Sequence, residues 1–211
     1  MENKAKQVVE YYLLCNNLKN IIRTGWLNWN VNEERVESIA EHIFGVQMLA
    51  LAMYNTYEYD IDILKVCLML AIHETEEIII GDKTMFEVTA EEKAKEGHEA
   101  IHRIFNEVLS APALEQLILE FDERKTKEAD FAYHCDKLEC DIQAKIYGDR
   151  KSVDLNNQDN NPTSKDPRVT KWFDQGLDFG QMWLKFGQER YGYDENFTDV
   201  SDYALSHNLS K

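Results

Sequence analysis

Residues 62–77 read Asp-Ile-Leu-Lys-Val-Cys-Leu-Met-Leu-Ala-Ile-His-Glu-Thr-Glu-Glu, and this stretch decides the fold. Between Ile63 and Ile72 only Lys65 is charged, so a helix here is apolar on nearly every side. A helix with that pattern is usually buried by its neighbours. We therefore predict a central helix that begins near Asp62 and ends near Gly81, because glycine commonly follows a helix C-terminus.

Helical spacing and capping residues predict further helices on both sides of this segment. An amphipathic helix is expected from about Asn3 to Ile22, and Arg-Thr-Gly-Trp (23–26) is expected to break it. Other helix starts are marked by N-cap residues, by capping-box spacing or by a first-turn proline. These starts are Ser38 (with Glu41), Thr89 (with Glu92), Ser110 (with Pro112), Thr126 and Asp166 (with Pro167).

Residues that break helices are scarce, with 3 prolines and 9 glycines in 211 residues. No segment shows the sustained period-two alternation of a half-buried strand. We therefore predict an all-α fold, a compact multi-helix bundle in one domain over residues 1–211. Within it we expect a core over about 10–147, a polar loop over 148–165 and a C-terminal helix over about 167–190.

The chain is acidic, with 23 Lys and Arg against 39 Asp and Glu, for a net charge of −16. Binding to nucleic acid depends on basic residues that neutralise backbone phosphates, so we expect no nucleic-acid partner. A small phosphorylated substrate would also be repelled by the surface as a whole. It would need local positive charge from a metal ion or from a well-placed arginine.

The cysteine pattern and the apolar runs predict a cytoplasmic protein. The chain has 4 cysteines with no Cys-x-x-Cys spacing, which is typical of a reducing compartment. The N-terminal stretch mixes Lys and Glu and does not resemble a signal peptide. The longest apolar run is too short to span a membrane, so we expect no membrane association.

His-Glu-Thr-Glu-Glu (73–77) places a histidine and three carboxylates at the end of an otherwise apolar helix. Such groups can hold a divalent metal ion, or the helix end can simply emerge into water, and this segment alone does not separate the two. His42 and Asp136 both lie beside apolar stripes in other predicted helices. A lone histidine there is more often hydrogen-bonded in the core, whereas a buried aspartate needs a cation or several donors.

The order of these residues, each on its own helix, resembles the HD-domain superfamily of metal-dependent phosphohydrolases. The similarity is strongest to the branch that contains deoxynucleoside 5′-monophosphate phosphatases. It extends over about residues 10–147. The pieces that carry it are Arg-Thr-Gly-Trp (23–26), Glu-Ser-Ile-Ala-Glu-His (37–42), His-Glu-Thr-Glu-Glu (73–77), Gly-Asp (81–82) and Cys-Asp-Lys-Leu-Glu (135–139).

This resemblance implies a homodimer and one divalent transition metal ion, which can be manganese, iron, cobalt, nickel or zinc. It implies that Glu77 positions or deprotonates the attacking water, that Asp82 contacts the sugar, that Arg23 binds phosphate and that Trp26 packs near the nucleoside. The implied activity is hydrolysis of (deoxy)nucleoside 5′-monophosphates by a metal-activated water. The implied metal ligands are His42, His73, Glu74 and Asp136.

Two alternatives remain open at this stage. The family takes its name from adjacent His and Asp, whereas position 74 is Glu, so a catalytically weak nucleotide-binding or interaction module is the second hypothesis. A remote third is a zincin-like metalloprotease, because His98-Glu99-Ala-Ile-His102 matches H-E-x-x-H. We expect those two histidines to be solvated instead. The last-helix aromatics could line a pocket, but we favour core or dimer-face roles for Trp172, Phe173, Trp183 and Phe186.

Overall fold

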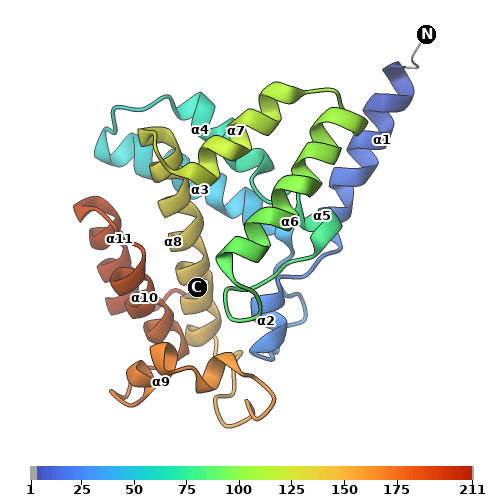
Figure 1. Cartoon of the computed structure of the whole chain (residues 1–211). Helices are drawn as coiled ribbons and strands as arrows, with labels where there is room; N and C mark the ends of the chain where they lie inside the picture. Colours follow the sequence, from blue (N-terminus) through green and yellow to red (C-terminus); the bar gives the residue numbers. More distant parts are fainter. Residues whose placement is uncertain (1–3, 211) are drawn as a thin grey trace.

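The computed structural model describes residues 4–210 and arranges them as a bundle of α-helices (Figure 1). Within that range the only β-type pairing is an isolated antiparallel bridge between Ile22 and Ser38, so the all-α prediction is confirmed. The helices are α1 (Lys4–Asn16), α2 (Thr24–Asn28), α3 (Ile39–Tyr57), α4 (Ile63–Ile72), α5 (Glu77–Ile80), α6 (Ala90–His102), α7 (Pro112–Glu123), α8 (Lys127–Asp149), α9 (Pro167–Phe173), α10 (Phe179–Arg190) and α11 (Glu195–Ser206).

The centre of the bundle is α8, which packs against α3, α4, α7, α10 and α11 (Figure 1). The prediction that the segment after Asp62 forms the central helix is therefore wrong. One face of α4 is buried through residues such as Val66 and Leu70, but Leu64 is 78% and Leu68 48% exposed. An all-round apolar pattern thus reflects two apolar faces here, of which only one packs into the core.

Four of the five predicted capping residues, Ser38, Thr89, Thr126 and Asp166, cap their helices as expected. Ser110 does not, because the N-cap of α7 is Ala111 and Pro112 is its first residue. The Ser38 hydroxyl accepts a hydrogen bond from the Glu41 amide, and Glu41 accepts one from the Ser38 amide, which completes a capping box. Thr89 and Glu92 form the same arrangement at α6. Because these contacts join residues only three positions apart, the local sequence is sufficient to specify them.

Two predicted helices end earlier than expected. The helix predicted over about 62–81 ends at Ile72, and four residues in turn conformation separate it from α5. The first helix ends at Asn16, followed by a 3-10 turn over Asn17–Lys19, and Asn3 lies outside the described residues. Residues 23–26 interrupt the chain as predicted but also open α2, since Thr24 is its first residue.

The prediction of one C-terminal helix over about 167–190 is wrong, because two helices, α9 and α10, occupy this range. Gly176 adopts a φ of +82°, a conformation that ends helical geometry. Asp178 then caps α10 in a capping box with Gln181. The chain continues into α11, which the sequence analysis did not anticipate.

The polar loop after α8 is tied to the bundle by buried side chains. Gln158 Nε2 donates to the Trp29 carbonyl at 3.0 Å, and Asn161 Nδ2 donates to Gln158 Oε1 at 2.9 Å. The Thr163 amide donates to Asn161 Oδ1 at 3.0 Å. Among the described residues, no helix is both long enough and apolar enough to cross a membrane.

Candidate metal centre and its cavity

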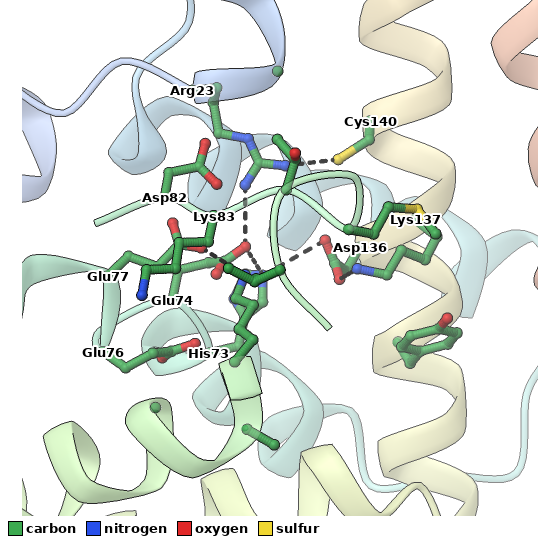
Figure 2. A pocket seen from close by; sticks show the side chains of 18 of the residues that line it. Arg23, His73, Glu74, Glu76, Glu77, Asp82, Lys83, Asp136, Lys137 and Cys140 are labelled. Carbon is green, nitrogen blue, oxygen red and sulfur yellow. Dashed lines mark hydrogen bonds and ion pairs between the residues drawn. The ribbon is translucent and has the colours of Figure 1, made fainter. Parts of the chain in front are cut away.

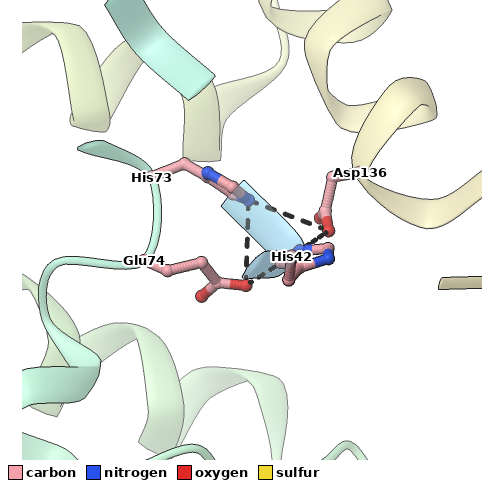
Figure 3. A group of neighbouring side chains, drawn as sticks. All are labelled: His42, His73, Glu74 and Asp136. Carbon is pink, nitrogen blue, oxygen red and sulfur yellow. Dashed lines mark hydrogen bonds and ion pairs between the residues drawn. The ribbon is translucent and has the colours of Figure 1, made fainter. Parts of the chain in front are cut away.

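The four predicted metal ligands, His42, His73, Glu74 and Asp136, converge in the structure (Figure 3). His42 comes from α3, Asp136 from α8, and the other two from the turn that follows α4. One ligand atom of each residue lies within 4.8 Å of those of the others, and all four residues are buried. The early end of α4 is thus what turns two consecutive side chains toward the same point.

The hydrogen bonds of His73 leave one imidazole nitrogen facing this group. His73 Nδ1 lies 2.8 Å from the Leu70 carbonyl, which can only accept, so Nδ1 carries the proton. His73 Nε2 then carries a lone pair, and this atom is buried without a hydrogen-bond partner among the described residues. An unpaired buried polar atom is costly, and a coordinated cation would satisfy it.

His42 is oriented in the same way by Glu139. Its Nδ1 lies 2.6 Å from Glu139 Oε2 and its Nε2 lies 3.1 Å from Asp136 Oδ1. With the proton on Nδ1, both Nε2 and the aspartate oxygen are acceptors, so either a second proton or a bound metal ion lies between them. A histidine whose second nitrogen donates to a carboxylate is the usual outer arrangement of a metal site. Two imidazoles and two carboxylates therefore fit a divalent transition metal ion.

Both carboxylates of the group are held in the ionised form that binds cations. Burial would raise the pKa of Glu74, but His73, Lys93 and Arg23 together lower it to about 2. Burial opposes ionisation of Asp136 as well, and Lys137, with Nζ 2.7 Å from Asp136 Oδ2, helps to hold its pKa well below the usual range. The negative charge of the group is thus retained despite burial.

Arg23 lies beside the metal-ligand group, between Glu74 and Cys140 (Figure 2). Its Nη1 donates to Glu74 Oε1 at 3.1 Å, and its Nη2 donates to Cys140 Sγ at 2.9 Å. Two anchors on one planar group hold the guanidinium in one orientation beside the metal-ligand group.

Glu77 is buried at the edge of the same group, with an exposed fraction of 1%. Its Oε1 accepts from Lys93 Nζ at 2.9 Å, while its Oε2 is buried without a hydrogen-bond partner among the described residues. Burial and the neighbouring Glu74 raise the pKa of Glu77 well above its ordinary value, and Lys93 opposes that shift. A carboxylate with one free oxygen and a raised pKa is suited to accepting a proton.

Asp82 and Trp26 also lie at the cavity, but each has a protein partner. Asp82 Oδ2 accepts from the Thr24 amide at 2.6 Å, and Thr24 Oγ1 donates to the Asp82 carbonyl at 2.9 Å. Trp26 is 6% exposed and its indole N–H donates to Glu37 Oε2 at 2.7 Å. Asp82 therefore joins the start of α2 to the segment after Gly81, and Trp26 offers ring surface rather than its N–H.

A cavity of about 630 Å³ opens onto the metal-ligand group and is large enough for a nucleotide-sized ligand. His73, Glu74 and Asp136 form part of its wall. Basic side chains that a phosphorylated ligand would need also line the wall, together with carboxylates such as those of the metal-ligand group. The basic residues are Arg23, Lys83, Lys93, Arg124, Lys137 and Arg190.

The H-E-x-x-H histidines do not join this group. His98 Nε2 lies 2.8 Å from Asp122, and His102 Nδ1 lies 2.9 Å from Glu115. Neither belongs to a group of candidate metal ligands in the described part of the chain. The arrangement therefore does not support a zincin-like site, although His98 does reach the cavity wall.

Four further residues of the site were not assigned by the sequence analysis. Glu139 orients His42, and Lys137 pairs with Asp136. Cys140 contacts Arg23, and Lys93 contacts Glu77. Glu139 could have been found, because it follows Asp136 by three positions and so shares its helix face. Lys137 directly follows Asp136 in the sequence, whereas Cys140 and Lys93 have their partners in other segments.

The chain is similar to known proteins of one family. A model of the HD domain family matches residues 15–172. The chain is 31% identical over 147 residues to the 5′-deoxynucleotidase HDDC2 of Dictyostelium discoideum, covering 66% of this chain and 76% of that protein. It is 33% identical over 143 residues to the 5′-deoxynucleotidase hdd1 of Schizosaccharomyces pombe, covering 64% and 70%.

Solved structures show the same architecture. The PH0347 protein of Pyrococcus horikoshii OT3 superposes with a TM-score of 0.68 at 25% identity, over 93% of this chain and 98% of that one. A "predicted metal-dependent phosphohydrolase" of Magnetospirillum magnetotacticum MS-1 shares the fold, with a TM-score of 0.67 at 19% identity over 97% and 94%. Because the family model spans most of its length, this chain belongs to the HD-domain family.

Proposed function

We propose that this chain hydrolyses the phosphate monoester of nucleoside 5′-monophosphates, with deoxynucleotides preferred, and that it uses one divalent transition metal ion. The observation that carries the proposal is the buried group of imidazoles and carboxylates beside Arg23 and Glu77 on one cavity wall. The relatives named 5′-deoxynucleotidases support the substrate class.

The site residues divide the chemistry among them. When bound, a divalent cation would lower the pKa of water and neutralise charge on the phosphoryl oxygens. Arg23 offers N–H donors to those oxygens from a position fixed by Glu74 and Cys140. Glu77 takes the proton of the attacking water, and Lys93 favours the ionised form that Glu77 needs for this. Asp82 faces the sugar.

The test is phosphate release from a panel of ribo- and deoxynucleoside 5′-monophosphates. The protein is stripped of metal and reloaded separately with manganese, iron, cobalt, nickel, zinc or magnesium. We expect phosphate release only with a transition metal, and a higher kcat/KM for deoxynucleotides. Release should be lost in His73→Ala, because this variant lacks the imidazole whose Nε2 has no hydrogen-bond partner among the described residues.

A folded protein that releases no phosphate with any metal would contradict the proposal. Nucleotide binding without turnover would then favour the binding-module hypothesis, which rests on Glu at position 74. Recovery of phosphate release in Glu74→Asp would assign the missing activity to the longer side chain.

We also propose that the chain forms a homodimer through α3 and α4, which pack against each other. Phe44, Met48 and Leu51 form a stripe on α3 with exposed fractions of 65%, 43% and 37%. Leu64 and Leu68 extend apolar exposure onto α4. Sedimentation should give a dimer for the wild type and a monomer for Phe44→Glu, with Leu155→Glu, at an exposed loop position, as the control. An unchanged mass for Phe44→Glu would place the interface elsewhere.

We propose two further properties of the chain, a cytoplasmic location and a single domain. The four cysteines are free thiols, which agrees with a site of action in the reducing cytoplasm.

α10 comes from the C-terminal third of the chain, yet it packs along α8 and contributes to the cavity wall. That packing supports one domain over residues 1–211.

A further inference from the structure

Part of the cavity wall is aromatic and comes from segments outside the metal-ligand group. Trp183 of α10 lines the cavity together with Phe86. Their ring centroids are 6.3 Å apart and their planes are inclined by 70°. The two rings therefore meet edge to face and form a corner rather than a stack.

The Trp183 ring is held in place by other aromatic side chains. Trp29 lies 6.2 Å from it at 84°, and Phe186 lies 5.3 Å from it at 74°. Its indole N–H has no hydrogen-bond partner among the described residues. Because this N–H is buried, the part of Trp183 that lines the cavity is ring surface rather than the donor.

Phe86 lies on a segment that is joined to the segment of Arg23, the predicted phosphate-binding residue. Phe86 follows Asp82 by four residues, and Thr24 follows Arg23 directly. The double contact between Asp82 and Thr24 joins the two segments, at 2.6 and 2.9 Å. The guanidinium and Phe86 are therefore carried by segments that are hydrogen-bonded to each other beside one cavity, and Trp183 meets Phe86 there from α10.

We infer that Trp183 and Phe86 form a subsite for the planar heteroaromatic base of the substrate. This inference rests on the proposed function, since it assumes a nucleotide with its phosphate directed toward Arg23. Aromatic side chains bind bases by stacking, which needs a flat surface and no particular hydrogen-bond pattern. Trp183 accordingly positions the nucleoside end, while the metal-ligand group and Arg23 act on the phosphate.

The experiment compares substrates with and without a base. For Trp183→Leu, kcat/KM for deoxyadenosine 5′-monophosphate should fall roughly 10- to 100-fold, the range expected for one lost stacking contact. kcat/KM for 2-deoxyribose 5-phosphate should stay within about twofold, and Trp183→Phe should retain most of the nucleotide activity. Trp172→Leu is the matched control, because Trp172 belongs to the same aromatic cluster but does not line the cavity.

A calorimetric titration with 2′-deoxyadenosine tests the subsite without any turnover. The wild type and Trp172→Leu should bind the nucleoside, and Trp183→Leu should bind it about tenfold more weakly or worse. Equal losses on both phosphorylated substrates, or unchanged nucleoside binding in Trp183→Leu, would overturn the subsite. If no nucleotide is hydrolysed at all, the proposed function fails, and the titration still decides whether a base binds against Trp183.

Discussion

Arg23 Nη1 lies 3.1 Å from Glu74 Oε1, and this oxygen also faces the metal-ligand group. The same atom is 3.7 Å from His42 Nε2 and 3.8 Å from His73 Nε2. A single carboxylate oxygen therefore serves both the candidate metal site and the cation assigned to phosphate. This sharing links metal binding to the position of the arginine.

Replacing Glu74 with Gln should remove metal binding while preserving side-chain length. A neutral amide oxygen is a weaker ligand than a carboxylate, so metal affinity should fall by more than the roughly 10- to 100-fold typical of outer contacts. Glu74→Asp keeps the charge and should still bind metal. Metal content measured by mass spectrometry after dialysis against a metal buffer separates the two. Full occupancy in Glu74→Gln would mean that Glu74 serves only Arg23.

Glu139→Gln should weaken metal binding by about 10- to 100-fold. The carboxylate lies 2.6 Å from His42 Nδ1 and sets which imidazole nitrogen faces the group. Competition with a coloured chelator gives the affinity. Asp130→Asn, which changes a carboxylate with 55% side-chain exposure on the same helix, is the control and should have no effect. Equal metal affinities in the wild type and both variants would show that Glu139 does not contribute to metal binding.

Gly45→Ala should produce the same defect without changing a charged residue. A methyl group at position 45 would collide with the Glu139 carboxylate, which must then move from His42. Metal affinity should fall together with the thermal midpoint, since overpacking costs about 1–3 kcal/mol. In Gly97→Ala the added carbon meets only Glu76 Cγ, at 3.5 Å, an ordinary contact. A loss of stability with unchanged metal affinity would show that the Glu139 carboxylate moves away from the added methyl group without releasing His42.

Lys93→Met should shift the pH dependence of activity to higher pH. Burial and Glu74 raise the pKa of Glu77, and Lys93 counteracts them, so its removal raises that pKa further. Because the proton acceptor must be ionised, the acid limb of kcat/KM should move upward, with about tenfold lower activity at a given acidic pH per pKa unit. Lys95→Met, at an exposed position on the same helix, should leave the limb in place. An unmoved limb in Lys93→Met would exclude Glu77 as the titrating group.

Glu37→Gln should flatten the dependence of stability on pH. Burial and Glu139 raise the pKa of Glu37 from its ordinary 4.5 to about 7, so between these values the folded state holds a proton that the unfolded state releases. The free energy of unfolding therefore falls as pH rises from about 4.5 to about 7, by about 3 kcal/mol from this group. Urea unfolding of both proteins at several pH values measures the difference. Parallel curves would show that Glu37 does not titrate in this window.

Local sequence was sufficient for several of the helix starts. The capping boxes at Ser38 and Thr89 use atoms three residues apart, and their formation does not depend on the rest of the fold. The residue types of the candidate metal ligands could also be read from the sequence, because histidines and carboxylates commonly bind divalent transition metal ions. Resemblance to a family then identified which histidines to choose, and it passed over His98 and His102.

Tertiary packing decided what local patterns could not. Whether an apolar face is covered depends on neighbouring helices, so the exposed leucines of α4 and the central position of α8 had no local signal. Arg23 reaches Cys140 across 117 residues of sequence, and Trp183 reaches the cavity from α10. Periodicity and capping describe interactions within about one helical turn. The orientation of His42 and Arg23 and the shape of the cavity arise from contacts between distant segments, which only the folded chain brings together.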